Sequence, residues 1–287
     1  MLGVLGDEWT LLIVQQALLG ARRYADFTAA LPISAAVLSA RLQSMTSQEL
    51  LSRREYQRNP PRSEYLTTAR SRALWPMLTS IWSWERTWVA EHTEPLPAML
   101  HVPCGQFFAP RVICRSCATA AFVGDVTAEW GPTGSWQRSI PVSANRRRTR
   151  RTGAGLLFPQ TMSVIGDRWG FAILVAAFLG VSRFTDFQQH LSAPPNTTSA
   201  RLANFTAEGI LEHRAGRYRL TEKGQAFFPV LVCALEWAQR WFASPDGPAV
   251  LLTHASCGHR FSPALHCDRC EGRIRGVDVS VIPPVSG

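Results

Sequence analysis

A chain of 287 residues is long enough for about two domains of ordinary size, and its 46% hydrophobic content supports a packed core rather than a disordered chain. Lys and Arg number 30 against 21 Asp and Glu, which gives a net charge of +9, and Lys223 is the only lysine. Arginine suits phosphate backbones and base edges, but this charge alone does not separate nucleic acid from an anionic membrane surface.

The apolar stretches are too short to cross a bilayer. Phe171 to Leu179 is about half the length that a spanning helix needs. The N-terminus has no charged segment ahead of an apolar run, so it does not read as a secretory signal. We therefore expect a cytoplasmic protein, whose reduced cysteines are metal ligands or sensors rather than disulfides.

The sequence contains one unit twice. Gly6–Trp9 reappears as Gly166–Trp169 at an offset of 160, and further along Tyr65 pairs with Tyr218 at an offset of 153. Seven residues (160 − 153) are therefore missing from the second copy, between Arg214 and Tyr218. Because a packed element tolerates such a length change poorly, the deletion marks a surface loop.

Two features precede the second copy. The run Asn145–Arg151 carries five arginines among small residues, and we expect either a solvated linker or a segment along a phosphate backbone. Leu156–Val164 stands ahead of the second Gly-Asp-Arg-Trp, whereas five residues stand ahead of Gly6. We expect a leading helix that is truncated in the first copy.

The elements of one unit follow a recognisable order. Apolar spacing, a helix-stopping Gly20 and a Ser34 N-cap predict three helices, and the third carries its polar residues on one outer face. This is the winged helix-turn-helix order, in which the third helix is the recognition helix. Such a helix fits the major groove, and arginines in the wing meet phosphate or the minor groove. In chain order we predict helices over about 9–19, from 24 to near 31, and 34–50, strands at 53–56 and 64–67 around a turn at 59–61, and a long helix over about 68–91.

These motifs resemble HxlR-type regulators, relatives of the MarR group. The resemblance is carried by Gly6–Ile13, Arg23–Phe27, Leu38–Leu42 and Pro60–Tyr65, and it covers about residues 3–90 and, more weakly, 160–242. It implies a DNA-binding regulator that usually acts as a dimer, often on genes that respond to reactive or toxic compounds.

The chain also departs from the family pattern. Positions 35, 36 and 40 are alanines where bulkier polar residues are usual, and Glu49 stands where a helix-ending glycine is expected. The second recognition helix has Thr198 where the first has Leu38, and its wing is cut to 215–217. We expect the copies to read different half-sites and the second to bind more weakly. The predicted DNA contacts are Ser34, Ser39, Arg41, Gln43, Arg58, Arg62, Asn196, Thr197, Ser199, Arg201 and Arg217.

Each long helix is followed by the pattern His-x2-Cys-x9-Cys-x2-Cys. Four soft and borderline ligands on two short knuckles are what tetrahedral Zn²⁺ needs, and with no open position the site would be structural. We predict two such modules, each with a ribbon-like hairpin completed by the strands near 122–129 and 276–282. The ligand sets are His101, Cys104, Cys114 and Cys117 in the first module and His254, Cys257, Cys267 and Cys270 in the second.

Alternatives remain open at several of these positions. The cysteines could be metal-free thiols or form a redox pair at Cys114 and Cys117, and His259 and His266 compete with His254 as ligands. Cys233, outside the pattern, is a small core residue or a redox-sensing thiol. The tryptophans of the two long helices favour packing between those helices, with an aromatic effector pocket as the alternative. They are Trp82, Trp84, Trp88, Trp237 and Trp241.

The predicted architecture is mainly helical with small β wings, duplicated, each copy followed by a zinc-ribbon-like module. We expect a sequence-specific DNA-binding regulator, favoured as a repressor, whose single chain imitates a dimer on double-stranded DNA. The alternative is a metal- or redox-sensing protein-interaction module that no longer reads DNA. The sequence shows no enzyme motif, and it leaves a small-molecule effector and a homodimer open. We expect the first winged helix at 1–95, the first zinc module at 96–132 and a basic linker at 133–154. The second winged helix is expected at 155–245 and the second zinc module at 246–287.

Overall fold

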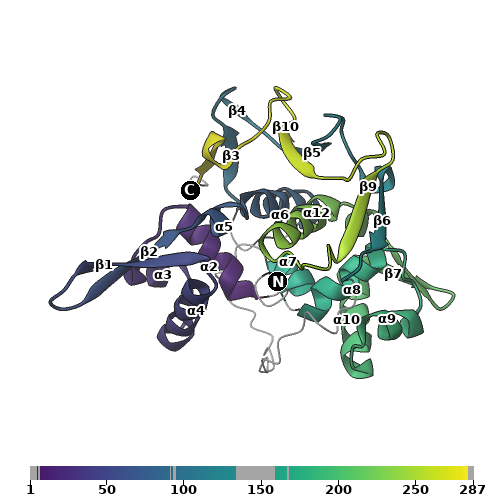
Figure 1. The fold of residues 1–287 in the computed structure, drawn as a ribbon, viewed down its shortest axis with the longest axis horizontal. Coiled ribbons are helices and arrows are strands. Elements are labelled where there is room, and N and C mark those ends of the chain that lie inside the picture. Colours follow the sequence, from purple (N-terminus) through teal and green to yellow (C-terminus); the bar gives the residue numbers. More distant parts are fainter. Residues whose placement is uncertain are drawn as a thin grey trace.

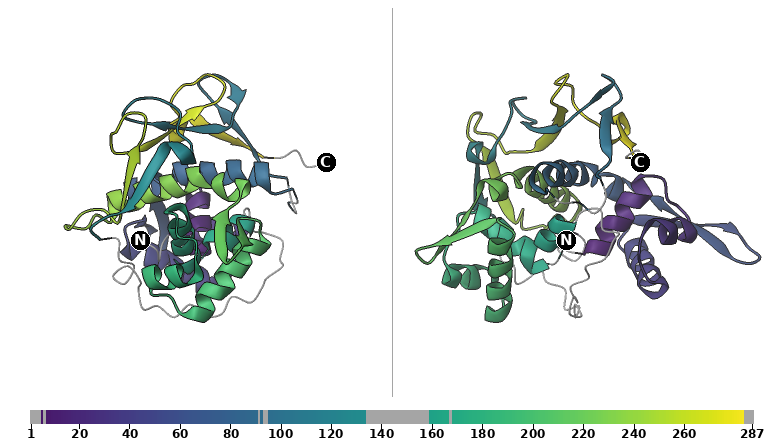
Figure 2. Two further views of the ribbon diagram at one scale, coloured as in Figure 1. Left: turned by 90° about the vertical axis from the view of Figure 1, so that its right-hand side faces the viewer. Right: turned by 180° about the vertical axis from the view of Figure 1, so that it is seen from behind.

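The molecule has three layers (Figure 1). The computed structural model describes residues 5, 7–90, 92, 95–133, 159–166 and 168–283. Two helical units with their wings form one side, a pair of packed helices crosses the middle, and short strands cover the opposite side. Figure 2 shows the same layering from the side and from behind. The basic run Asn145–Arg151 lies outside the described residues.

The first unit has the predicted helix, helix, helix and wing. Asp7 caps the first helix through the backbone N–H of Thr10, and Ser34 caps the third through the N–H of Val37. Leu38, Leu42 and Met45 form its buried face, as their spacing predicts. The elements are α2 (Glu8–Leu18), α3 (Tyr24–Ala30), α4 (Ala35–Ser47), β1 (Leu51–Gln57) and β2 (Arg62–Thr67).

The second unit repeats this order after a leading helix, α7 (Pro159–Ile165). Its wing is a tight hairpin, because Ala215 and Gly216 both have positive φ (48° and 71°) and leave a two-residue turn between the strands. The seven-residue deletion therefore falls at the wing tip. The elements that follow are α8 (Arg168–Phe178), α9 (Phe184–Leu191), α10 (Pro195–Ala207), β7 (Leu211–Arg214) and β8 (Arg217–Leu220).

The third helix ends earlier than predicted. The sequence indicated a helix to about Leu50, but α4 ends at Ser47 because Glu49 adopts a left-handed conformation with φ of 56°. The equivalent Gly209 has φ of 70°. Glycine adopts this conformation without strain and a glutamate does not, so the first copy keeps the turn at some cost.

The long helix predicted over about 68–91 is divided into α5 (Ala69–Arg72) and α6 (Trp75–Trp88). Proline lacks the N–H that would continue the helix and its ring clashes with the preceding turn, so Pro76 is accommodated at the start of a new helix. The second copy divides in the same way at Pro229, into α11 (Glu222–Gln225) and α12 (Phe228–Trp241).

Helices α6 and α12 pack against each other and join the two copies. Two equivalent hydrogen bonds cross this contact: Trp84 Nε1 donates to the carbonyl of Lys223 at 3.1 Å, and Trp237 Nε1 donates to that of Arg70 at 2.8 Å. Trp84 and Trp237 are 3% exposed. These tryptophans therefore pack in the core, as the favoured interpretation of their spacing predicted.

The strands after the long helices pair across the copies. β3 (Ala98–His101) pairs with β4 (Gln106–Phe107) and with β11 (Val279–Ile282) of the second copy. β5 (Pro110–Cys114) pairs with β10 (Pro263–Cys267), and β6 (Val126–Trp130) pairs with β9 (Val250–His254). The expectation that strands near 122–129 and 276–282 complete hairpins within their own modules is wrong, because each strand is exchanged with the other copy.

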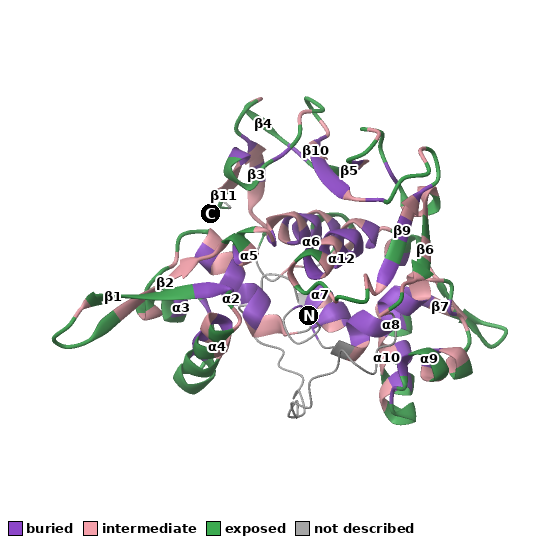
Figure 3. Ribbon diagram, viewed as in Figure 1, coloured by how far each residue is buried: buried purple, intermediate pink, exposed green. Residues whose placement is uncertain are grey.

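The buried residues lie mainly on the helices at the centre of the molecule, as Figure 3 shows. The buried residues of α2, α8, α6 and α12 form one continuous cluster that extends into β5, β9 and β10. The outer surfaces of α4 and of the β1–β2 wing are exposed. No helix in the described ranges has the length and apolar character needed to cross a membrane.

Candidate metal centres and DNA-reading face

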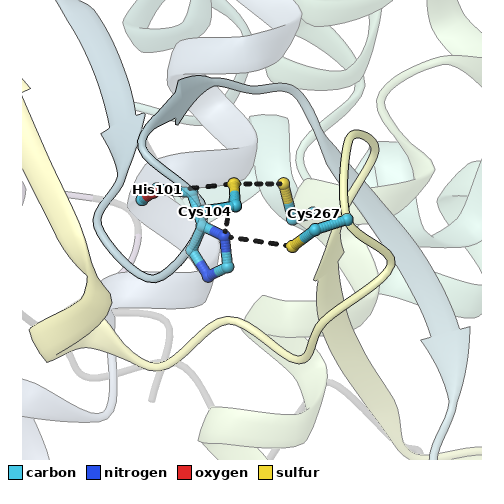
Figure 4. A group of neighbouring side chains, drawn as sticks. His101, Cys104 and Cys267 are labelled. Carbon is cyan, nitrogen blue, oxygen red and sulfur yellow. Dashed lines mark hydrogen bonds between the residues drawn. The ribbon is translucent and has the colours of Figure 1, made fainter.

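The strand layer brings two groups of four metal-ligating side chains together. The first ligand set consists of His101, Cys104, Cys267 and Cys270, whose ligand atoms all lie within 4.8 Å of one another. His101 Nδ1 lies 3.3 Å from Cys104 Sγ and 3.4 Å from Cys270 Sγ, and Cys104 Sγ lies 4.0 Å from Cys267 Sγ. Figure 4 shows the three labelled side chains converging from two loops.

The second ligand set is the pseudo-symmetric equivalent of the first. It consists of Cys114, Cys117, His254 and Cys257, again within 4.8 Å of one another. His254 Nδ1 lies 3.3 Å from Cys117 Sγ and 3.4 Å from Cys257 Sγ. His259 and His266 belong to neither of the sets found among the described residues.

These distances match the edges of a metal tetrahedron. Zn–S bonds of ~2.3 Å and Zn–N bonds of ~2.0–2.1 Å at tetrahedral angles give S···S edges of about 3.8 Å and N···S edges of about 3.6 Å. The separations between the ligand atoms of the first set are 3.3, 3.4 and 4.0 Å. A donor set of three thiols and one imidazole nitrogen also favours Zn²⁺ over oxygen-preferring cations. Both clusters could therefore hold a metal ion.

The ligand sets are crossed between the copies, which corrects the predicted grouping. The sequence pattern assigned His101 and Cys104 to the same site as Cys114 and Cys117, but each histidine knuckle lies against the Cys-x2-Cys knuckle of the other copy. The antiparallel register explains this. Cys114 lies at the far end of β5, about 13 Å from Pro110 at ~3.3 Å per residue, whereas Cys267 pairs directly with Pro110.

The histidine rings are fixed by apolar neighbours rather than by a second hydrogen bond. Nδ1 faces the thiols, and Nε2 of both His101 and His254 is buried without a hydrogen-bond partner in the described part of the chain. Phe108 and Phe261 each lie 5.9 Å from the histidine ring, between ring centroids. Nδ1 of each histidine is therefore the nitrogen that faces the thiols and that a metal ion would bind.

The surroundings of the two sets differ at one equivalent position. Thr119 Oγ1 lies 3.0 Å from Cys117 Sγ, and the hydrogen bonds of Thr119 lower the pKa of the Cys117 thiol to about 6. The residue equivalent to Thr119 (119 + 153 = 272) is Gly272, which has no side chain to offer Cys270. This pair was not among the residues singled out from the sequence, although the offset of 153 could have found it; the contact of Thr119 with Cys117 is visible only in the structure.

A separate surface lies on the opposite side of the molecule, where α4 and α10 project away from the strand layer (Figures 1 and 2). On α4 the side chains of Ser39 and Gln43 are exposed, and Ser34 is exposed at its N-cap. Tyr24, which the sequence did not single out, donates from its hydroxyl to the carbonyl of Ala35 at 2.9 Å and accepts from Ser39 Oγ at 3.4 Å. Tyr24 thereby ties α3 to the exposed end of α4.

Arg41 differs from the other predicted DNA contacts. Its Nη2 lies 2.8 Å from Asp7 Oδ1, and its side chain is 36% exposed. Asp7 also caps α2, so this ion pair connects the start of α2 with the recognition helix. In this structure Arg41 is therefore held by an ion pair within the protein, and its base contact stays a prediction.

The wing of the first copy is long and basic. Arg58 and Arg62 are exposed and make no ion pair in the part of the chain that the structure describes. Arg54, in contrast, forms an ion pair with Glu64 across the strands. The two outer arginines thus remain available to an anionic partner.

The second copy offers a smaller polar surface. Asn196 and Ser199 of α10 are exposed, Thr197 and Arg201 are half-buried, and Arg217 is exposed in the short wing, with Nη1 3.3 Å from Ser182 Oγ. Thr198, at the position of Leu38, is buried, and its hydroxyl donates to the carbonyl of Pro194 at 3.3 Å. The substitution therefore keeps α10 packed.

Other candidate positions have structural roles. Cys233 is 6% exposed, and burial raises the pKa of its thiol to about 12, which favours the core interpretation over the redox one.

A cavity of about 30 Å³ between α8, α12, β6 and β9 is lined by apolar residues such as Val126, Phe178 and Leu235. Ligand pockets usually enclose roughly 300–1,000 Å³, so this cavity does not accommodate an effector as it stands.

The fold and the exposed third helices define a tandem winged helix-turn-helix protein. The family model of HxlR-like helix-turn-helix proteins matches residues 4–93 and 164–246, and the chain belongs to this family. It is 31% identical over 131 residues to the HTH-type transcriptional regulator Rv3095 of Mycobacterium tuberculosis, which covers 43% of this chain and 83% of Rv3095.

Two further similarities cover part of the chain. The HTH-type transcriptional regulator YvaP of Bacillus subtilis is 37% identical over 87 residues, or 30% of this chain and 81% of YvaP. The crystal structure of PA1607 shares 34% sequence identity over 39% of this chain and 81% of that chain, with a TM-score of 0.34. Rv3095 and YvaP each match less than half of the chain, as expected for a protein in which the family unit occurs twice.

Proposed function

We propose that this protein is a sequence-specific DNA-binding transcriptional regulator, acting as a repressor, that uses both winged helices of one chain. The observation that carries the proposal is the projection of α4 and α10 from the same side of the molecule (Figure 1). Two recognition helices on one side can enter successive major grooves if they lie about one helical turn of DNA apart.

The first copy makes the stronger contact in this proposal. The N-terminal part of α4 meets base edges through Ser34, Ser39 and Gln43, and the long wing places Arg58 and Arg62 on the phosphate backbone. The exposed alanines Ala35, Ala36 and Ala40 suit apolar contact with thymine methyl groups rather than hydrogen bonding.

The second copy reads a different half-site. Asn196, Thr197 and Ser199 offer amide and hydroxyl groups where the first copy has Ala36, Val37 and Ser39. The short wing exposes Arg214, Arg217 and Arg219, of which Arg214 forms an ion pair with Glu212. Because this wing is shorter, it reaches fewer phosphates, and the half-site contributes less affinity. The preferred duplex is then an asymmetric pair of half-sites instead of a perfect palindrome.

We further propose that each chain binds two structural Zn²⁺ ions. Three thiolates and one imidazole complete the coordination of each ion, so no position stays open for catalytic water. Because each ligand set takes residues from both copies, each ion would link the copies. The free energy of metal binding would then stabilise the orientation of the two winged helices as well as the strand layer.

Binding to genomic duplex fragments at two salt concentrations tests the DNA proposal. We expect affinity to fall steeply with salt and a subset of fragments to be enriched at the higher concentration. Elemental analysis of protein purified without chelator tests the metal proposal, with about two zinc ions per chain expected. No sequence preference, or no binding at low salt, would favour the alternative of a metal-sensing protein-interaction module.

A further inference from the structure

The two ligand sets have the same donors but different surroundings. Within each Cys-x2-Cys knuckle the first cysteine is buried in both sets, as Cys267 and Cys114. The second cysteine is half-buried as Cys117 in the second ligand set and exposed as Cys270 in the first. An exposed thiolate is the ligand that solvent protons, competing chelators and electrophiles reach first.

The neighbouring residue strengthens this difference. The Thr119 hydroxyl lies 3.0 Å from Cys117 Sγ and hydrogen-bonds the thiol of this half-buried cysteine. At Gly272 a Cβ atom would lie 3.2 Å from Cys270 Sγ, so a side chain there would cover the exposed sulfur, but glycine leaves it open. Loss of such a supporting contact to a ligand typically costs 10–100-fold in metal affinity.

The remaining contacts do not compensate for this exposure. The backbone N–H of Arg269 donates to Cys267 Sγ at 3.4 Å, but Cys267 is the buried cysteine of its knuckle. Cys104 Sγ donates to the carbonyl of His101 at 3.6 Å, which also leaves Cys270 uncovered. The first ligand set is thus open on one side, at the thiol of Cys270.

We propose that the two metal sites are functionally unequal: the ion held by His101, Cys104, Cys267 and Cys270 is exchangeable, whereas the ion held by Cys114, Cys117, His254 and Cys257 is permanent. This inference rests on the proposed zinc binding. Because the sets are crossed, loss of the exchangeable ion releases the link between β3 of the first copy and the end of β10 in the second. The second ion keeps the other link closed, so the chain loosens on one side without separating.

Zinc release from the full chain to 4-(2-pyridylazo)resorcinol, followed by absorbance, tests the proposal. We expect two phases of about one zinc each, with rates that differ by about tenfold or more. Cys270→Ser should remove the fast phase and keep the slow one, and the equivalent Cys117→Ser should do the reverse. Thr119→Val, which keeps the shape and removes the hydroxyl, should accelerate the slow phase alone.

The control is Thr28→Val, which removes an exposed hydroxyl of α3 that bonds within its own helix and lies outside both ligand sets, and it should leave both phases unchanged. A single phase that releases both ions, or a slow phase indifferent to Thr119→Val, would overturn the inequality of the sites. A wild-type protein without zinc would contradict the proposed cofactor itself, so the two failures are distinguishable.

Discussion

Ser80 Oγ and Cys233 Sγ lie 4.0 Å apart in the core, where α6 crosses α12. They occupy equivalent positions in the two copies, since their numbers differ by the offset of 153. Ser80 is 2% exposed and Cys233 is 6% exposed. Two small side chains at this pseudo-twofold point let the long helices of the copies approach closely, and the tryptophan hydrogen bonds flank this contact.

A larger side chain at this crossing should destabilise the protein. We expect Ser80→Leu to lower the free energy of unfolding by about 1–3 kcal/mol, because the added methylenes overpack a filled core. Thr87→Leu, on the exposed side of the same helix, should change it by less than about 0.5 kcal/mol. Urea denaturation monitored by tryptophan fluorescence measures both. Equal effects of the two substitutions would show that the crossing has room for a leucine.

Pairs of cysteine substitutions distinguish crossed ligand sets from sets within each copy. Cys104→Ser with Cys267→Ser damages one crossed set and should leave about one tightly bound zinc per chain. Cys104→Ser with Cys114→Ser damages both sets, although both residues lie in the first copy, and should leave no tightly bound zinc. Zinc content after dialysis against a weak chelator gives the answer, and Cys233→Ser is the control that retains both ions. The opposite pattern would indicate ligand sets within each copy.

The sequence predicted the winged helices well because their signals are local. The helix cap at Ser34, the spacing of Leu38 and Leu42, and the deletion at Ala215 each lie within one element or one turn. Comparison of the copies also identified the eight residues that the structure gathers into two candidate metal sites, since the histidines keep the same offset as the cysteines.

The grouping of those ligands could not be predicted in the same way. A repeat is compatible both with four ligands from one copy and with four ligands shared between copies. The choice depends on the pairing of β5 with β10, a contact between residues about 150 positions apart. The ion pair of Arg41 with Asp7 could not be predicted for the same reason, because Asp7 lies at the start of a different helix.

Glu85 should make stability depend on pH. Burial raises the pKa of its carboxyl, which accepts a 2.6 Å hydrogen bond from the backbone N–H of Thr161 in α7. A raised folded-state pKa means that this group's contribution is complete below the unfolded value of about 4.3 and is lost as pH rises through the folded value. Glu85→Gln keeps an acceptor and removes the charge, so the variant should gain stability over wild type as pH rises from 5 to 8.

Urea midpoints across this pH range check the Glu85 prediction. The exposed Glu129 of β6 provides the control, since Glu129→Gln should follow the wild-type curve. His92, 3.7 Å from Glu85 Oε2, and Lys223 lower the Glu85 pKa and partly oppose the effect of burial. A midpoint for Glu85→Gln that falls relative to wild type as pH rises would mean that these cations outweigh burial.

The wing of the first copy should supply phosphate contacts without sequence preference. Arg58 and Arg62 are exposed and lie at the end of the wing, so replacing both with alanine should weaken binding to preferred and random duplexes to a similar degree. Each lost phosphate contact reduces the slope of log K against log salt by about 1, so the slope should fall by about 2. Fluorescence anisotropy titrations at several salt concentrations measure both quantities. Arg111→Ala, on β5 in the strand layer, is the matched control and should leave the slope unchanged. If the double substitution weakened only the preferred duplex and kept the slope, the wing would read bases in the minor groove instead of contacting phosphates.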